Sequence, residues 1–278
     1  MSTKKAAVVR KVITWIVTIF FAVIVVFPFY YMIVMSITPD SDILSNNIGL
    51  IPSSVYLGNI VKALTQTMLV RQFLNTIFVS LCILVLQVIT SLLAAYAFAF
   101  LDFKGKKAIF MVFLATMMMP SETTIISNYL DVSSWGWLDT YQVLIIPLAA
   151  SALGIFLLRQ YFMTMAKEIR EAAMIDGCSE TRFLWRIATP LAKPMIAAFS
   201  VSAFLSAWGQ YMWPLLVTSK DEMRVVQVGI TAMLDADSNL SMGLALASVM
   251  LVTVPSLLVF LIGHKQLVEG MMAGAVKG

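Results

Sequence analysis

Charged side chains are concentrated in one internal stretch, residues 167–177, of a chain that is otherwise poor in charge. Lysine and arginine alternate there with glutamate and aspartate, and the small residues Ala172 and Ala173 lie among them. Neither paired acids at membrane depth nor a histidine cluster nor a serine-based constellation is found in the sequence, so catalysis has no visible basis. The chemistry open to these side chains is ion pairing and hydrogen bonding with another surface. The stretch therefore indicates a docking site.

The stretch predicts a short helix from Lys167 to Asp176. Ile169, Ala172 and Ala173 share one face of it at helical spacing, which places small alanines where another surface can approach. Gly177 is suited to the left-handed backbone that ends a helix, and it predicts a turn at this point.

A second helix is expected beyond the turn. Ser179 is suited to cap its first turn, and Phe183 and Ile187 share one of its faces. Pro190 disfavours helical geometry at Thr189, so the sequence predicts that the helix ends near residue 188. Two short helices meeting at an angle make a compact element for docking.

An amphipathic helix resting on lipid is the alternative for a basic loop of this kind. The first helix is half acidic, with Glu168, Glu171 and Asp176, and it has no large apolar face. Anionic lipid would repel that arrangement, which favours docking to a protein.

The composition is that of a membrane protein. Hydrophobic residues make up 60% of the chain and charged residues 12%, whereas a soluble protein has about 45–50% apolar and about 25% charged residues. A helix needs about 20 apolar residues to cross the hydrocarbon core. The sequence predicts an all-α integral membrane protein with a single transmembrane domain over residues 1–278 and a loop over 164–194. Its expected spans are residues 12–37, 76–100, 108–129, 141–163, 195–218 and 243–263.

Basic residues set the expected orientation. Of the 19 lysines and arginines, all but Lys62, Arg71, Lys220 and Arg224 lie in the N-terminal region, the loops after the second and fourth spans, and the C-terminal tail. The positive-inside rule then predicts that both termini and the 164–194 loop are cytoplasmic. The first span lacks a small-residue cleavage site, which predicts a retained span and not a signal peptide.

Packing and bending within the spans also have signals. Prolines lie in or near five of the spans and predict bent helices; they are Pro28, Pro120, Pro147, Pro214 and Pro255. Ser91, Ala95 and Ala99 recur every four residues and predict a close approach of the second span to a neighbour. The exterior connections 39–72, 131–140 and 220–242 are expected to be solvated connectors.

The charged loop resembles the EAA loop of permease subunits from binding-protein-dependent ABC importers. The matching residues are Glu171-Ala172-Ala173, Gly177, Ile187 and Pro190, with Thr189 where leucine is usual. The tail Glu269–Gly278 is similar to that of carbohydrate permeases related to the second membrane subunit of the maltose transporter, with Met271-Met272 in place of the usual Leu-Thr. The similarity extends over nearly all of the chain.

The resemblance implies the permease fold of type I ABC importers with a cytoplasmic coupling helix, in a bacterial plasma membrane. It implies a second, related permease, an ABC ATPase dimer that binds ATP and Mg, and an extracytoplasmic solute-binding protein. The permease itself would be neither an enzyme nor a cofactor or metal protein, and it would not bind nucleic acid. By resemblance, the ATPase is contacted by Glu171, Ala172, Ala173, Asp176, Gly177, Ile187 and Pro190, and by the tail residues Gly274, Val276, Lys277 and Gly278.

The solute is expected to be a sugar or oligosaccharide, and the sequence does not specify which one. Aromatic and polar groups in the spans are the candidates for its pathway, because rings stack on sugar C–H faces and amides bond hydroxyls. These candidates are Glu122, Asn128, Tyr129, Trp208, Gln210 and Tyr211. Trp213 instead has the position expected of an aromatic belt at the outer interface.

A proton- or ion-coupled secondary transporter is the alternative function. Glu122 is the only acid within a predicted span, and such a carrier would have a carboxylate at its centre. Carriers of that class usually contain two matching halves. No repeat is evident between residues 1–140 and 141–278, which counts against this alternative.

Overall fold

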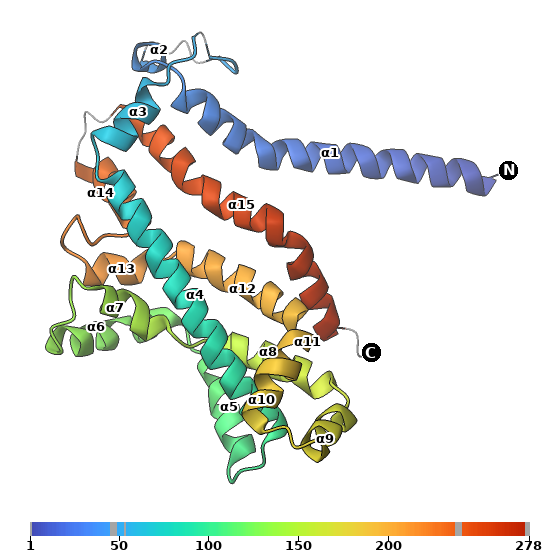
Figure 1. Cartoon of the computed structure of the whole chain (residues 1–278). Helices are drawn as coiled ribbons and strands as arrows, with labels where there is room; N and C mark the ends of the chain where they lie inside the picture. The colour runs from blue at the N-terminus through green and yellow to red at the C-terminus, as the bar shows by residue number, and fades with distance from the viewer. Residues whose placement is uncertain (1, 45–48, 53, 237–240, 276–278) are drawn as a thin grey trace. The chain divides into compact units, whose positions relative to one another are not determined.

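A computed structural model describes residues 2–44, 49–52, 54–236 and 241–275 (Figure 1). Within these ranges the chain is helical and contains no strand, which confirms the all-α prediction. The chain divides into two compact units: unit 1 comprises residues 1–70 and 230–253, and unit 2 comprises residues 71–229 and 254–278. The predicted docking loop and the candidate pathway residues all belong to unit 2.

Unit 1 contains α1 (Ser2–Ser36), α2 (Asp40–Leu44) and α3 (Gly58–Thr65). Asn59 on α3 is fully buried, and its side-chain amide donates to the carbonyls of Ser36, at 3.2 Å, and Thr38, at 3.0 Å. This fixes α3 to the end of α1. The most apolar stretch of α1 has none of its residues buried within the chain.

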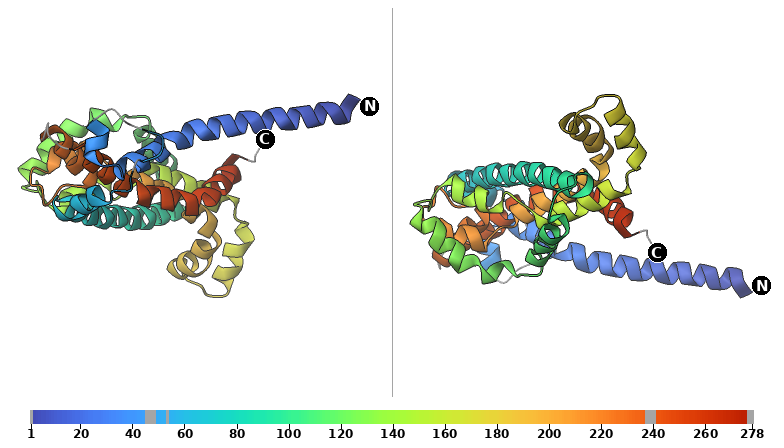
Figure 2. Two further views of the ribbon diagram at one scale, coloured as in Figure 1. Left: turned by 90° about the horizontal axis from the view of Figure 1, so that it is seen from above. Right: turned by 90° about the horizontal axis from the view of Figure 1, so that it is seen from below.

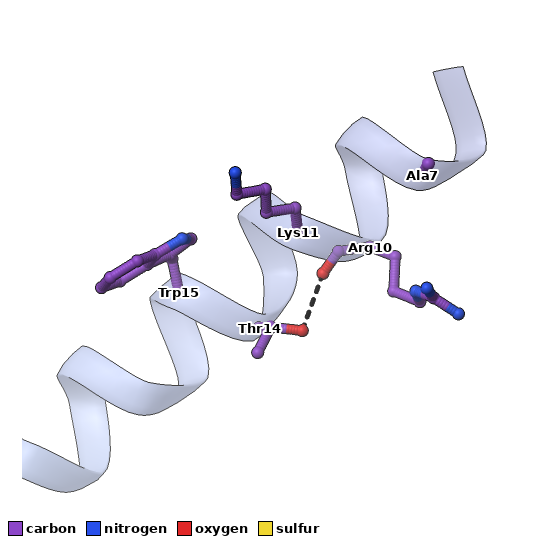
Figure 3. A pocket seen from close by; sticks show the side chains of 5 residues that line it. All are labelled: Ala7, Arg10, Lys11, Thr14 and Trp15. Carbon is purple, nitrogen blue, oxygen red and sulfur yellow. Dashed lines mark hydrogen bonds between the residues drawn. The ribbon is translucent and has the colours of Figure 1, made fainter. Parts of the chain in front are cut away.

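A shallow pocket on the surface of α1 is lined by Ala7, Arg10, Lys11, Thr14 and Trp15 (Figure 3). The Thr14 hydroxyl donates to the Arg10 carbonyl at 2.9 Å, so it turns back onto its own helix. Basic residues one turn from a tryptophan are typical of a helix entering the membrane interface.

Unit 2 is built around α4 (Leu69–Phe100), a long helix with core clusters at both ends. Residues Leu92, Ala95 and Tyr96 near its C-terminal end belong to one cluster, and Val79 and Ile83 belong to the other. The helices that follow in unit 2 are α5 (Lys106–Thr116), α6 (Ile125–Ser134), α7 (Tyr141–Ile145), α8 (Ala152–Thr164), α9 (Lys167–Ile175), α10 (Glu180–Phe183), α11 (Thr189–Leu191), α12 (Lys193–Trp208) and α13 (Met212–Val217). Helices α14 (Val226–Ala236) and α15 (Met242–Ala275) each contribute to both units.

Four stretches of helix in the described residues are long and apolar enough to cross a membrane, and they correspond to the first, second, fourth and sixth predicted spans. They are Ala7–Ser36, Leu69–Phe100, Tyr141–Thr164 and Met242–Val268. A fifth is added if Glu180–Leu191 and Lys193–Trp208, which meet at 79°, form one broken span. Of the four stretches, Tyr141–Thr164 is itself divided into α7 and α8, and each of the other two predicted spans is also divided between two helices.

The expected spans 108–129 and 195–218 are both interrupted. The first is divided between α5 and α6, with Pro120 and a 3-10 turn, Ser121–Thr123, between them. Proline has no N–H to continue a helical ladder, which explains that break. The second is divided between α12 and α13. Helix α12 is followed by Gly209, whose N–H donates to the Leu205 carbonyl at 3.0 Å, and α13 begins at Met212.

The break near Pro147 is stabilised by side chains from other helices. Pro147 cannot donate to the carbonyl of Val143, four residues earlier, and the Trp213 indole N–H donates to that carbonyl at 2.8 Å. Trp213 is consequently only 7% exposed, and the prediction that it belongs to an interfacial belt is wrong. On the other side of the break, Gln87 and Thr90 of α4 donate to the Leu148 and Ala149 carbonyls at 2.8 and 3.0 Å.

Close helix packing follows the predicted small residues of α4. Ser91 and Ala95 are fully buried. A Cβ added to Gly154 of α8 would lie 2.4 Å from both the Ser91 Oγ and the Phe199 Cζ. The glycine therefore allows α4, α8 and α12 to approach each other, as the spacing of small residues predicted for α4.

The connection that follows α13 is anchored and not a solvated connector, so that prediction is wrong for its central part. Val225, Val226 and Val228 are buried. The Asn75 amide of α4 donates to the Glu222 and Arg224 carbonyls at 2.7 and 3.1 Å, and the Thr76 hydroxyl accepts from the Val226 N–H at 2.8 Å. The Tyr141 hydroxyl donates to the Asn75 side-chain oxygen at 2.8 Å, which adds α7 to this network.

Asp139 joins the connection before α7 to the same segment. Its carboxylate accepts from the N–H and the hydroxyl of Ser219, at 2.7 and 2.6 Å, and from the Lys220 N–H, at 2.9 Å. Its backbone N–H donates to the Val217 carbonyl at 3.0 Å, and its φ is +57°. Burial opposes ionisation of Asp139, but the bonds from Lys220 and Ser219 outweigh it and lower the pKa of this carboxyl.

Candidate functional site

The first helix of the charged loop forms as predicted. Helix α9 covers Lys167–Ile175, and Gly177 has a φ of +77°. The Gly177 N–H donates to the Met174 carbonyl at 3.0 Å, and the Cys178 N–H donates to the Ala173 carbonyl at 2.9 Å. These bonds cap the last carbonyls of α9. The left-handed turn predicted at Gly177 is confirmed.

The second helix begins as predicted, but it does not end where it was expected to. The Ser179 hydroxyl caps α10 by accepting from the Arg182 N–H at 3.4 Å. A π-helical turn, Leu184–Ala188, then leads into α11, and Thr189 is helical with φ −62° and ψ −48°. The prediction that Pro190 ends the helix at Thr189 is therefore wrong. The wider turn of a π-helix makes room for the proline ring next to the preceding carbonyls, and the chain bends by 79° after Leu191.

The second helix is attached to the membrane helices by its buried face. Phe183 is 1% exposed and lies in one cluster with Tyr96 of α4 and Phe162 of α8. Ring centroids of Phe183 lie 6.2 Å from Tyr96 and 5.9 Å from Phe100. Ile187 packs against the same cluster, so the predicted common face of Phe183 and Ile187 is confirmed.

Helix α9 presents a different outer face from the one predicted. Ala173 belongs to the core cluster and is buried, so it does not face outward with Ala172. Four exposed residues recur at i, i+3, i+4 and i+7 and form a surface that we call the α9 outer face: Glu168, Glu171, Ala172 and Ile175. Lys167 and Ile169 of α9 are also exposed. Ile175 is 86% exposed, so a large apolar side chain lies open on this face beside the two carboxylates. In the views of Figure 2, α9 and α10 lie next to each other.

Three charged or polar side chains connect α9, α10 and α4. Glu180 of α10 accepts a hydrogen bond from the Tyr96 hydroxyl of α4, and it forms an ion pair with Arg170 of α9. The Arg170 Nε donates to the other oxygen of the same carboxylate at 3.4 Å, so one edge of the guanidinium, Nε and Nη2, meets both carboxylate oxygens. We call Tyr96, Arg170 and Glu180 the three-helix cluster.

The electrostatics of this cluster favour the charged forms of its ion pair. Burial opposes ionisation of Glu180, but hydrogen bonds from Tyr96 and Arg170 and the charge of Arg170 outweigh it and lower the pKa of Glu180. The hydrogen bond to Glu180 likewise raises the pKa of Arg170. Sequence reasoning missed the cluster because Tyr96 lies far from the loop along the chain. The signal available in the sequence was the spacing of Arg170 and Ala173. They are three residues apart and therefore share a face of α9, so an inward Ala173 places Arg170 on the inward side as well.

The candidate pathway residues differ in their surroundings. Trp208 is 4% exposed, stacks on Phe204 and meets Phe73 edge to face, so little of its ring is open to a solute. Gln210 is half-buried in the break between α12 and α13. Tyr129 of α6 and Tyr211 are half-buried, and both pack against the same core cluster.

The other predicted site residues are less enclosed. Glu122, in the turn before α6, and Asn128, on α6, are exposed. Gly274 lies in the last turn of α15. The tail residues Val276, Lys277 and Gly278 lie outside the described residues.

Residues 87–266 match the family "Binding-protein-dependent transport system inner membrane component". The arabinooligosaccharides transport system permease protein AraQ of Halalkalibacterium halodurans is 31% identical over 273 residues, which cover 96% of this chain and 98% of that protein. The sn-glycerol-3-phosphate transport system permease protein UgpE of Rhizobium meliloti is 34% identical over 258 residues, which cover 90% and 92%.

A solved structure has the same fold. It is described as the crystal structure of a bacterial ABC transporter involved in the import of the acidic polysaccharide alginate, and it aligns with a TM-score of 0.84 at 22% identity, over 95% of this chain and 98% of that one. The family match covers the α9–α11 loop together with most of unit 2. This chain belongs to the family of multi-pass inner membrane permease components of binding-protein-dependent ABC transport systems.

Proposed function

We propose that this chain is one of two permease subunits of an ATP-driven importer for a sugar or oligosaccharide, coupled to its ATPase through the α9–α11 loop. The α9 outer face is the observation that carries the proposal. It is a helical surface that the chain leaves uncovered, on a loop whose other face is anchored in the core through Ala173 and Phe183. A surface held firmly on one side and open on the other is suited to receive a partner and to transmit its movement.

The α9 outer face combines an apolar anchor with negative charge. Ile175 is the large apolar group, Ala172 allows close approach, and Glu168 and Glu171 supply carboxylates. Burial of one large aliphatic side chain contributes about 1.5–3 kcal/mol to an interface. We infer that the ATPase offers a cleft with an apolar floor for Ile175 and a basic or amide-rich rim for the two carboxylates.

The proposal includes six spans and cytoplasmic termini. The interrupted segments α5–α6 and α12–α13 are taken as broken spans, which with the four apolar stretches make six. Irregular backbone at membrane depth is tolerated where it lines a cavity or is buried in protein. The break at residues 209–211 carries Gln210 and Tyr211, which supports a pathway there. The 164–194 loop is then cytoplasmic, on the side where ATPases reside.

Four kinds of partner follow from this function. A second, related permease completes the pathway, an ABC ATPase dimer holds ATP and Mg, and a solute-binding protein delivers solute on the far side of the membrane. Lipid covers the remaining apolar surface. The tail residues Gly274, Val276, Lys277 and Gly278 are proposed to reach the ATPase interface. This chain is the transport component, and ATP hydrolysis belongs to its partner.

The alternative function, a proton- or ion-coupled secondary transporter, is disfavoured, because the chain belongs to a family of binding-protein-dependent transport components.

A neutral solute is favoured over a phosphate ester. Apart from Trp208, whose ring is covered, the candidate pathway residues offer two phenols, two amides and a single carboxylate, namely Tyr129, Tyr211, Asn128, Gln210 and Glu122. They include neither lysine nor arginine, the side chains that usually bind phosphate. Among the relatives, one is named for arabinooligosaccharides and others for sn-glycerol 3-phosphate. We therefore propose an oligosaccharide or sugar and make the phosphate ester the competing outcome.

The substitution Glu171→Lys tests the coupling part of the proposal. Reversal of this charge on the α9 outer face is expected to reduce copurification of the ATPase at least tenfold and to abolish uptake, with normal amounts of permease in the membrane. Asp102→Lys is the matched control, because its side chain is fully exposed outside the loop. Full uptake and normal ATPase recovery with Glu171→Lys would contradict docking through α9.

Competing uptake assays test the solute. Cells that express this permease with the transport genes beside it are given labelled arabinooligosaccharides or labelled sn-glycerol 3-phosphate. Uptake of the saccharide that depends on this chain supports the proposal, and uptake of the phosphate ester alone overturns the assignment of a neutral solute.

A further inference from the structure

The angle between α9 and the rest of the chain is not fixed at the turn itself. A Cβ added to Gly177 would meet nothing within 4 Å, so no packing restrains the turn from outside. Within α9, only Ala173 is buried, and the capping bonds at Gly177 and Cys178 are local. The apolar contact through Ala173, with Met174 packed against the same cluster, attaches α9 to the core. A directional restraint is also needed to keep α9 from rotating on that contact if it is to transmit movement.

The three-helix cluster supplies that restraint. Arg170 is on the inward side of α9, and its side chain is 27% exposed, compared with 40% for Glu180. The guanidinium presents two N–H donors of one edge, from Nε and Nη2, to the two oxygens of one carboxylate, and this fork fixes direction as well as distance. A single lysine-type contact would leave α9 free to rotate about it.

Tyr96 extends the restraint to α4. It is 5% exposed, and its ring packs against Phe100, Phe162 and Phe183 at 5.1, 6.4 and 6.2 Å between centroids. The ring position is therefore set by the core, and a buried tyrosine hydroxyl needs a partner. That partner is the carboxylate of Glu180, which also pairs with Arg170.

We propose that Tyr96, Arg170 and Glu180 are positioning residues that hold α9 at a fixed orientation on α4, so that movement of a docked ATPase reaches α4 without loss at the Gly177 turn. This inference rests on the proposed docking of α9. It goes beyond that function by assigning the transmission to three side chains that do not belong to the docking surface. The cluster has no role in binding the ATPase itself.

The first test measures the mobility of α9 without any ATPase. Amide hydrogen exchange of residues 167–176 is followed in the permease pair in lipid nanodiscs. Tyr96→Phe and Glu180→Gln are each expected to raise the exchange rate about fivefold. The increase in the double variant should be no larger than in either single variant, because both substitutions break the same connection. Tyr161→Phe is the matched control, since it removes a tyrosine hydroxyl that packs at the same core but bonds the Leu191 carbonyl.

The second test measures transmission in the assembled importer. Native Cys82 lies on α4, and in a Cys178→Ser background its alkylation by N-ethylmaleimide reports changes around that helix. Trapping the ATPase with ATP and vanadate is expected to change this rate at least threefold in the parent chain. In Tyr96→Phe and Glu180→Gln the change should fall to less than half, with undiminished ATPase copurification.

Three outcomes would overturn the inference. They are unchanged exchange of α9 in both single variants, additive effects in the double variant, and a Cys82 response that is absent in the parent chain or preserved in the variants. Failure of the proposed docking is distinguishable from failure of this inference. If α9 does not dock, Glu171→Lys leaves ATPase recovery normal, whatever the exchange rate of α9 is in the other variants. A loss of ATPase recovery in Tyr96→Phe would also contradict the separation of positioning from docking.

Discussion

At the scale of single residues, Asp139 shows how much one carboxylate can organise. It accepts three hydrogen bonds from Ser219 and Lys220 and holds a positive φ that few residues adopt. Aspartate and asparagine are enriched in this left-handed region. A residue such as alanine at this position would both lose the bonds and strain the backbone.

Asp139→Asn separates the charge from the backbone conformation. Asparagine tolerates the same φ, so the expected loss comes from the charge-assisted bonds and amounts to about 1–2 kcal/mol of unfolding free energy. Asp139→Ala should lose about 1–2 kcal/mol more, because alanine is strained at positive φ. Thermal unfolding of the purified permease complex in detergent measures both variants.

The same carboxylate predicts a pH dependence. Its pKa is lower in the folded chain than in the unfolded chain, where it lies at about 3.9. The stabilisation is therefore present above the unfolded pKa and is lost as the pH falls through the folded pKa. Between pH 7 and pH 3 the parent chain should lose more stability than Asp139→Asn, and parallel curves for the two would contradict this.

At the scale of elements, the packing of α4, α8 and α12 depends on the absence of a side chain at Gly154. The missing Cβ leaves room for Ser91 and for the buried ring of Phe199. Ser91 is fully buried and Phe199 is fixed in α12, so neither can move aside at low cost.

Gly154→Ala is accordingly expected to destabilise the permease by about 1–3 kcal/mol, because it overpacks this contact. The amount of folded permease extracted from membranes and its midpoint of thermal aggregation are the measurements. Adding Ser91→Ala removes one of the two clashing atoms and should recover part of the loss. An unchanged midpoint in Gly154→Ala would show that the three helices do not pack as closely as described.

The sequence was sufficient to predict those features of the loop that depend only on residues a few positions away in the chain. The α9 boundaries, the left-handed Gly177 and the Ser179 cap were all predicted from the sequence. The failures at Pro190 and Trp213 have a different origin. Each depended on a compensating feature elsewhere, a π-helical turn in one case and an orphaned carbonyl at Val143 in the other. A pattern of residue types does not contain that information.

The site shows the same division. The motif spacing predicted the charged loop as the candidate for docking, and that role stays a prediction. The structure places the exposed face of α9 one helical position away from the predicted one, with Ile175 exposed on it. Ala173 is buried because Tyr96, Phe162 and Phe183 build a core beneath α9. That core comes from three separate helices, so the periodicity of a nine-residue helix was insufficient to decide which alanine faces outward.

At the scale of the whole molecule, the number of spans is the main prediction to test. Single cysteines are placed at exposed positions on both sides of each interrupted segment, in a chain with Cys82→Ser and Cys178→Ser. Lys104→Cys and Ser134→Cys bracket α5–α6, and Thr181→Cys and Lys220→Cys bracket α12–α13. A membrane-impermeant maleimide should label positions 134 and 220 in intact cells, and positions 104 and 181 only after permeabilisation.

The outcome distinguishes the possible topologies directly. If both members of a pair react from the same side, the segment between them is re-entrant and does not cross the membrane. Labelling of position 181 in intact cells would place the α9 outer face outside the cell, where no ATPase is present, and would contradict the proposed coupling.

Helix α4 has a mechanical consequence that follows from its lack of proline and glycine. It runs without interruption from Leu69 to Phe100, a length of about 48 Å at 1.5 Å per residue. Tyr96 lies near one end, and Asn75, which holds the Glu222 and Arg224 carbonyls, lies near the other. Tyr96 and Asn75 are 21 residues apart on this helix, about 32 Å, so a tilt of about 6° about the Tyr96 end displaces Asn75 by about 3 Å, the length of a hydrogen bond. A small tilt at the Tyr96 end is therefore enough to exchange the bonding partners of Asn75.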